Sequence, residues 1–185
     1  ATPDALFPNN VFGTAAGRAI IGRMRHEVRQ REAARTDIRD FFRDVLGREE
    51  IDLSMQPHPC ELTGALVIDR ARGLGFCGLS ERCDEAGARL MHEAFGLRAT
   101  LLFDLAPGEY HTNVVLAVLA GRAAVVCPRG FADPVVPAAI ADPAQRIRAI
   151  HDRTIRMRSE KSLAYTQAIA GVLNLMPRSY IGSVL

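Results

Sequence analysis

The sequence lacks three features that would place it at once in a broad class of protein. None of its apolar runs approaches the roughly 20 residues that a membrane-spanning helix needs, so no membrane segment is expected. Its first residues contain neither a basic segment nor a long apolar one, so no secretory signal is predicted. The 185 residues carry a formal net charge of only +2, which gives no overall case for binding nucleic acid or another acidic surface.

Cysteine is scarce, and its spacing excludes the common metal and redox motifs. The four cysteines are Cys60, Cys77, Cys83 and Cys127, and no two of them form a C-x-x-C pair. We therefore predict no metal site, no redox motif and no cofactor. An even number permits disulfides, but without a signal sequence a cytoplasmic protein with reduced thiols is the better interpretation. Cys60 precedes Glu61, whose charge disfavours a thiolate, so Cys60 is expected to be a poor nucleophile.

The first third of the chain reads as two short strands followed by a helix. The length suits one domain with its own core. Residues 6–12 predict a turn that enters a strand, residues 18–22 a second strand, and residues 26–46 an amphipathic helix. The apolar residues of that helix fall three or four apart and are expected to be buried: Ala34, Ile38, Phe41, Phe42 and Val45.

The middle of the chain repeats this pattern of paired strands and a helix. Strands are predicted over 51–53, 63–70, 76–79, 100–105, 114–119 and 123–127, with one helix over 80–95. Ser80 is expected to cap this helix and Gly96 to end it. A hairpin, a helix and a strand in succession indicate ββαβ units, so the fold class is α/β with several small sheets. A helix is also predicted over 142–158, and the last segment, 163–175, is predicted to be helical or mixed.

Two residues stand where rigid strands would fix the direction of their side chains. His111 lies between a turn and the apolar run 114–119, which is a suitable place for a proton-transfer residue. Glu61 precedes its own predicted strand, so neighbouring strands would bring the carboxylate and the imidazole together. The carboxylate would then stabilise the protonated imidazole and hold its tautomer. The alternatives are a structural histidine and an ordinary surface glutamate.

Polar and basic residues elsewhere give weaker signals. The amides of Asn9, Asn10 and Asn113 would hold the N–H groups of a planar ligand through their carbonyl oxygens, or simply shape turns, and turns are favoured for Asn9 and Asn10. The segment 145–161 carries six basic residues without interleaved aromatic residues. A solvated helix face is therefore favoured over a phosphate-binding face.

Four blocks of sequence, in order, resemble the guanidine-modifying superfamily. Its members include arginine deiminases, dimethylarginine dimethylaminohydrolases, succinylarginine dihydrolases and amidinotransferases. The blocks comprise residues 7–10 with 22–26 and 29–32, then residues 61–70, 78–88 and 110–114. The likeness covers residues 2–134 and is weak over 143–185.

The resemblance implies a fold and a chemistry. The fold would be the pentein fold, an α/β propeller of five ββαβ modules, of which this chain would hold about three. The chemistry would be that of a hydrolase, or an amidinotransferase, which cleaves a guanidino or amidine C–N bond of an arginine-like small molecule through a cysteine, a histidine and a glutamate. Glu61 and His111 would be catalytic, whereas Phe7, Asn10 and Asn113 would bind the substrate.

The chain also departs from the pattern of these relatives. Asn10 and Asn113 stand where relatives often have aspartates, which removes negative charge facing a cation and leaves room for guanidines or amidines other than arginine. The nucleophilic cysteine of the relatives has no counterpart in the tail 181–185. Residues 1–185 would therefore form a single incomplete domain, completed by a further C-terminal segment or by a second copy in a homodimer. A catalytically inactive guanidinium-binding module is the alternative, and a nucleic-acid-binding protein is a distant third.

Overall fold

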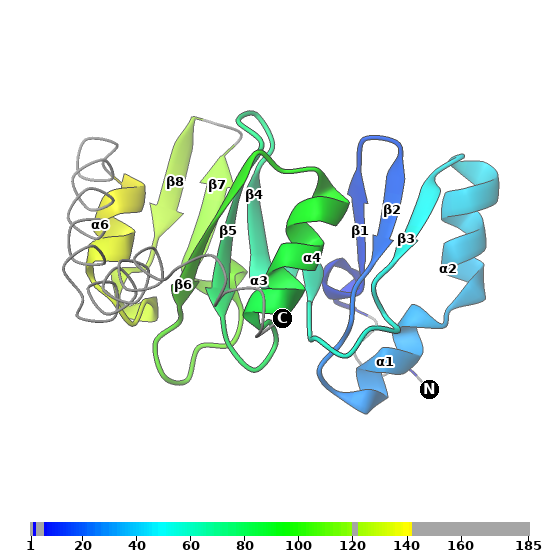
Figure 1. Ribbon diagram of the computed structural model, residues 1–185, viewed down its shortest axis with the longest axis horizontal. Helices are drawn as coiled ribbons and strands as arrows, with labels where there is room; N and C mark the ends of the chain where they lie inside the picture. The colour runs from blue at the N-terminus through cyan, green and yellow to red at the C-terminus, as the bar shows by residue number, and fades with distance from the viewer. Residues whose placement is uncertain (1, 3–5, 120–121, 142–185) are drawn as a thin grey trace, which may run out of the picture. The chain divides into compact units, whose positions relative to one another are not determined.

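Small sheets joined to helices make up the part of the protein that the structure describes (Figure 1). The computed structural model describes residues 2, 6–119 and 122–141. Two sheets have three strands each and a third has two. Every sheet begins with an antiparallel hairpin, and in the first two a helical connection returns a third strand parallel to the second. The chain thus forms two complete ββαβ modules and the beginning of another, as the sequence predicts.

The first module contains a helical region that is shorter and more broken than the sequence predicts. Its elements are η1 (Pro8–Asn10), β1 (Phe12–Ala15), β2 (Arg18–Ile21), α1 (Glu27–Ala33), α2 (Thr36–Asp40), η2 (Phe41–Val45) and β3 (Glu49–Asp52). The single helix expected over 26–46 is wrong, because Arg35 is extended and separates α1 from α2. Its side chain binds the carboxylate of Asp37 within the first turn of α2.

The expected buried face of this helical region is also wrong. Phe41 remains 49% exposed and Val45 remains 68% exposed. Ala33 of α1 is buried and joins Val11, Ile21 and Met24 in a small core. Phe42 of η2 is only half-buried, and its ring stacks on that of Phe12 in β1 at 6.4 Å. Periodicity alone did not distinguish α1 from the later turns, because apolar residues recur at helical spacing in both.

The second module is the most regular part of the structure. Its elements are α3 (Leu62–Ala65), β4 (Leu66–Asp69), β5 (Leu74–Leu79), α4 (Glu85–Phe95) and β6 (Ala99–Asp104). The strand predicted over 63–70 begins only at Leu66, since α3 takes up the preceding turn. Gly96 ends α4 in a left-handed conformation with φ of 64°, as expected from its lack of a Cβ.

The N-terminal cap of α4 differs from the prediction. Asp84 caps the helix, because its Oδ1 accepts a hydrogen bond of 2.7 Å from the N–H of Gly87. Ser80 lies in the preceding turn, where its hydroxyl accepts the N–H of Arg82 and donates to the carbonyl of Tyr110 at 2.8 Å. The hydroxyl of Ser80 therefore connects two loops and does not cap a helix.

The third module is described as far as its first long helix. Its elements are α5 (Thr112–Val115), β7 (Leu116–Leu119), β8 (Ala123–Val126), η3 (Pro128–Gly130) and α6 (Val135–Ala141). Helix α6 was not predicted from the sequence, although Pro137 in its first turn is compatible with a helix. The segments predicted to be helical at 142–158 and 163–175 lie outside the described residues.

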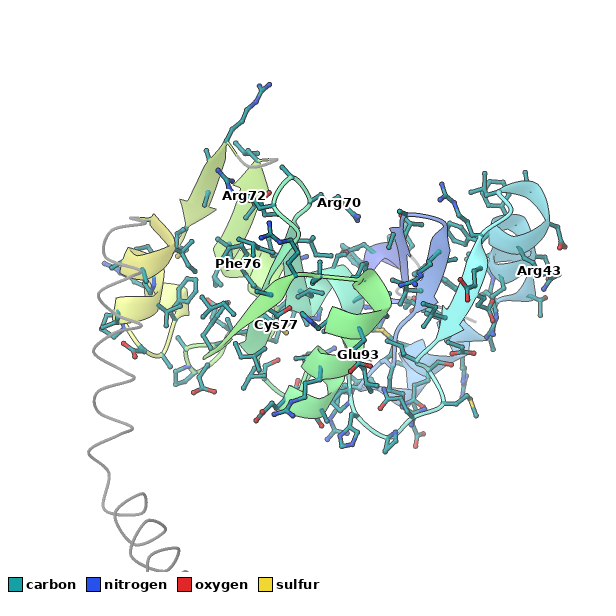
Figure 2. The ribbon with its side chains drawn as sticks, turned by 45° about the horizontal axis from the view of Figure 1, so that its top comes forward. Arg43, Arg70, Arg72, Phe76, Cys77 and Glu93 are labelled. Carbon is teal, nitrogen blue, oxygen red and sulfur yellow. The ribbon has the colours of Figure 1, made fainter. Side chains whose placement is uncertain are left out.

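Two large apolar cores hold the modules together, one on each face of the β4–β5–β6 sheet. Phe76 and Cys77 are neighbours on β5, and their side chains belong to different cores (Figure 2). The core around Cys77 includes Ile20, Leu62, Leu66, Met91 and Phe95. The core around Phe76 includes Phe103, Val115, Leu116, Phe131 and Ile140. Among the described residues, no helix combines the length and the apolar character needed to cross a membrane.

Candidate functional site

Glu61 and His111 occupy the same structural position in consecutive modules. Each is the residue before a single helical turn, α3 for Glu61 and α5 for His111, and each turn leads directly into a strand. We expected both residues at the starts of strands, and this is wrong by one helical turn. The turns form because the carbonyls of Glu61 and His111 accept backbone hydrogen bonds from residues three ahead, at 3.0 and 3.3 Å.

The two side chains meet in the interior. Nε2 of His111 lies 2.8 Å from Oε2 of Glu61, and the residues are 5% and 0% exposed. An ionised carboxylate only accepts hydrogen bonds, so Nε2 of His111 carries the hydrogen atom of this bond and donates it to Glu61. The expected meeting of carboxylate and imidazole is therefore confirmed, whereas their catalytic roles stay predictions.

Two further groups hold the Glu61 carboxylate in place. Its Oε1 accepts the backbone N–H of Arg25 at 3.0 Å, and the guanidinium of Arg82 lies 3.3 Å from the same oxygen. Burial by itself raises the pKa of Glu61, but the hydrogen bonds from His111 and Arg25 and the charge of Arg82 outweigh it. The pKa of Glu61 thus lies below its ordinary value, and the carboxylate is ionised at neutral pH.

Thr112 joins the two turns that carry this pair. Its hydroxyl donates to the carbonyl of Ala65 at the end of α3 and accepts the N–H of Gly78 in β5 at 2.7 Å. Thr112 is completely buried and follows His111 directly in the chain. These two hydrogen bonds therefore fix the start of the third module against the second, at the point where His111 faces Glu61.

A cleft of about 440 Å³ lies in front of the histidine. It is lined by Phe7, Asn9, Asn10, His26, Val28, Arg29, Arg82, Tyr110, His111, Asn113 and Val114. All three residues predicted to bind substrate, Phe7, Asn10 and Asn113, line this cleft together with His111. Glu61 does not line it and lies behind the imidazole.

Arg29, Arg82 and Tyr110 are among the lining residues that were not singled out from the sequence. The guanidinium of Arg82 lies 5.6 Å from the centre of the Tyr110 ring, and that ring lies 4.8 Å from the His111 ring. Arg29 is buried and forms a two-pronged ion pair with Glu32 at 2.9 and 3.0 Å. Arg29 and Arg82 fall inside the blocks of family resemblance, which was the available signal, but neither was assigned a role.

No cysteine lines the cleft within the described part of the chain. Cys60, Cys77 and Cys83 are buried, and Cys127 is exposed at the end of β8. Burial raises the pKa of Cys60 to about 11, so this thiol stays protonated at neutral pH. The expectation of a poor nucleophile agrees with this, although burial rather than the neighbouring Glu61 is the main cause. The described residues also contain no cluster of three or more groups suited to a metal ion.

Gly64 is required where α3 approaches the cleft. A Cβ at this position would lie 2.6 Å from Oδ1 of Asn10 and 3.0 Å from Cε1 of His111. We expect Gly64→Ala to lower the free energy of unfolding by about 1–3 kcal/mol, because the methyl group displaces both side chains. Urea denaturation tests this prediction. In an Asn10→Ala background the penalty should shrink, and equal penalties in both backgrounds would contradict the clash.

Comparison with solved structures identifies the fold. The N-terminal domain of ArgZ bound to product, an arginine dihydrolase from cyanobacteria, matches with a TM-score of 0.66 and 19% identity over 78% of this chain and 52% of that one. A dimethylarginine dimethylaminohydrolase adduct with 4-chloro-2-hydroxymethylpyridine matches with a TM-score of 0.53 and 23% identity over 68% of this chain and 48% of that one. The chain thus spans about half the length of these two structures. A search of curated proteins found no match.

The protein has the pentein fold. The sequence model of the eukaryotic N,N dimethylarginine dimethylhydrolase family matches residues 1–146, and the chain belongs to this family. At the level of the family, the chemistry is hydrolysis of a guanidino group.

Proposed function

We propose that this chain supplies the acid–base pair and part of the binding cleft of a hydrolase that acts on the guanidino group of an arginine-like small molecule. The observation that carries this proposal is the buried contact of 2.8 Å between Glu61 and His111 at the edge of a cleft. Membership of the family supplies the class of reaction. An amidinotransferase would use the same pair, but an amine instead of water would attack the guanidino carbon.

The pair is suited to proton transfer at a guanidinium carbon. A thiolate adds to this carbon, and the C–N bond to the departing amine breaks as the protonated His111 donates its proton. His111 then accepts a proton from water, which attacks the same carbon and releases a ureido product and the thiol. Glu61 would keep the imidazole oriented and stabilise its charged form throughout. The cysteine in this scheme would come from outside the described residues.

The charges in the cleft favour a substrate that also bears a carboxylate. Arg82 is a positively charged residue of the cleft, and the carboxylate of Glu61 that pairs with it is also engaged by His111 and by the N–H of Arg25. Neutral amides at Asn10 and Asn113 provide carbonyl oxygens for the N–H groups of a guanidinium. An amino acid with a guanidino side chain satisfies both ends of such a site.

The experiment is an assay for ureido product with arginine, methylated arginines and succinylarginine, alongside agmatine, which lacks the carboxylate. We expect product from a carboxylate-bearing substrate and far less from agmatine, and we expect His111→Ala to abolish it while calorimetry still detects binding. Product formation that survives His111→Ala would overturn the proposed role of this residue.

A second candidate function is a guanidinium-binding module without turnover. It is favoured by the absence of a cysteine from the cleft lining within the described residues and by the buried, protonated Cys60. Saturable binding of a guanidino ligand without any product would support this candidate. The absence of binding would contradict both the hydrolase and the binding module. Completion of the domain by a further segment or by a second copy, and a location in the cytoplasm, remain predictions.

A further inference from the structure

A second hollow, which borders the segment that supports Glu61, has a basic lining. This basic hollow encloses about 240 Å³ and is lined by Arg23, Met24, Arg25, Gln30, Pro57 and Pro59. A water molecule takes up about 30 Å³ in the liquid, so the hollow has room for a small ion together with part of a larger ligand. None of its lining residues is acidic, and two of the six are arginines.

The two arginines are not neutralised by carboxylates. Arg23 uses one N–H on the carbonyl of Ser54 at 2.7 Å, and within the described residues it forms no ion pair. The side chain of Arg25 is exposed and has no hydrogen bond or ion pair with any described residue. By contrast, Arg29 in α1, Arg39 in α2 and Arg89 in α4 each bind a carboxylate. Two arginines that line one hollow, neither of them paired with a carboxylate among the described residues, favour an anionic ligand.

The same short segment connects the basic hollow to the candidate active site. The side chain of Arg25 lines the hollow while its backbone N–H donates to Oε1 of Glu61 at 3.0 Å. The next residue, His26, lines the cleft. Arg23 is in turn held to Cys60, the residue before Glu61, by a backbone hydrogen bond of 2.9 Å. A ligand bound to Arg25 would therefore act on a group that positions Glu61.

We propose that the basic hollow is a binding site for a small oxyanion, a phosphate or a carboxylate group of a metabolite, held by Arg23 and Arg25 next to the backbone N–H that donates to Glu61. The planar guanidinium groups match the paired oxygens of both kinds of anion. The walls formed by Pro57, Pro59 and Met24 would contact an apolar part of the ligand. This site is separate from the cleft proposed to bind the guanidino substrate.

The test is calorimetric titration of the protein with inorganic phosphate and, separately, with succinate at low ionic strength. We expect saturable binding that Arg25→Gln and Arg23→Gln each weaken about tenfold, since each removes a charge-assisted hydrogen bond. Arg25→Lys keeps the charge without the fork and should weaken binding less. Arg89→Gln, at an exposed position on α4, is the control and should leave binding unchanged. Tighter binding of phosphate or of succinate identifies which anion the site prefers.

Two outcomes would overturn the proposal. One is binding that is lost in Arg82→Gln but unchanged in Arg25→Gln, because the anion would then occupy the cleft. The other is the absence of saturable binding of either anion. The backbone amide of Arg25 gives an independent readout, since its NMR signal should shift on addition of phosphate and report contact at the hydrogen bond to Glu61. Both readouts are independent of turnover, so failure of the proposed hydrolase activity would not affect them.

Discussion

Replacing Glu61 with glutamine is expected to lower the free energy of unfolding at pH 7 by about 3 kcal/mol, the low end for breaking a buried ion pair. Glutamine keeps an acceptor for the N–H of Arg25 but leaves the charge of Arg82 without its buried partner. The low end applies because the side chain of Arg82 is 19% exposed, so water compensates part of the loss. Urea denaturation of the two proteins measures the difference.

The same pair of proteins should differ less in acid. The pKa of Glu61 is lowered by folding, so its contribution is complete above its ordinary value of about 4.3 and is lost as the pH falls through the lower folded value. The gap between wild type and Glu61→Gln should therefore close from pH 7 to pH 3. A gap that stays constant would show that the ionised carboxylate contributes nothing.

Glu81→Gln is the matched control for this experiment. Glu81 lies 3.1 Å from Nε of the same arginine, Arg82, but its side chain is 58% exposed. Surface pairs of this kind contribute about 0–1 kcal/mol, so this variant should stay close to wild type at both pH values. A loss as large as that of Glu61→Gln would indicate that Arg82, and not the buried carboxylate, dominates the effect.

Thr112→Val is expected to cost about 2–3 kcal/mol, because it leaves the N–H of Gly78 and the carbonyl of Ala65 without their hydroxyl partner in the interior. Valine has nearly the same shape, so the loss reports the hydrogen bonds rather than packing. The ring of His111 should also become less fixed, which would broaden its NMR signals. Denaturation and imidazole NMR together measure these two effects.

Thr112→Ser separates the hydroxyl from the methyl group. Serine keeps both hydrogen bonds and loses one buried methyl, which costs about 1 kcal/mol. The His111 signals should then resemble those of wild type. If serine and valine were equally destabilising, the connection between α3, β5 and α5 through this hydroxyl would not be the stabilising feature.

The sequence predicted the order of strands and helices better than the environment of each helix. The hairpins were recognisable because apolar residues alternate with turn residues, and the ββαβ order followed from their spacing. The exposure of Phe41 and Val45 was not predictable, since whether a face of helical spacing meets a partner depends on the tertiary structure. The single turns α3 and α5 were missed because four residues are too few to show helical periodicity.

The candidate site was predictable only in part, for a similar reason. The positions of Glu61 and His111 before apolar runs indicated that they would meet, and they do. The partners of Glu61 were not indicated, because the N–H of Arg25 and the side chain of Arg82 arrive from loops whose course no local pattern specifies. The hydroxyl of Thr112 likewise bonds to Ala65 and Gly78, which lie 47 and 34 positions away along the chain.

Glu61 and His111 occupy the same position in consecutive modules. The distance between their side chains therefore depends on how the two neighbouring modules of the propeller are packed together. Each module contributes one member, so an excised module would retain either His111 or Glu61, never both. A small rotation between blades would lengthen the 2.8 Å contact before it disturbed any single sheet. The proposed proton transfer therefore depends on how two modules are packed together and not on either sheet alone.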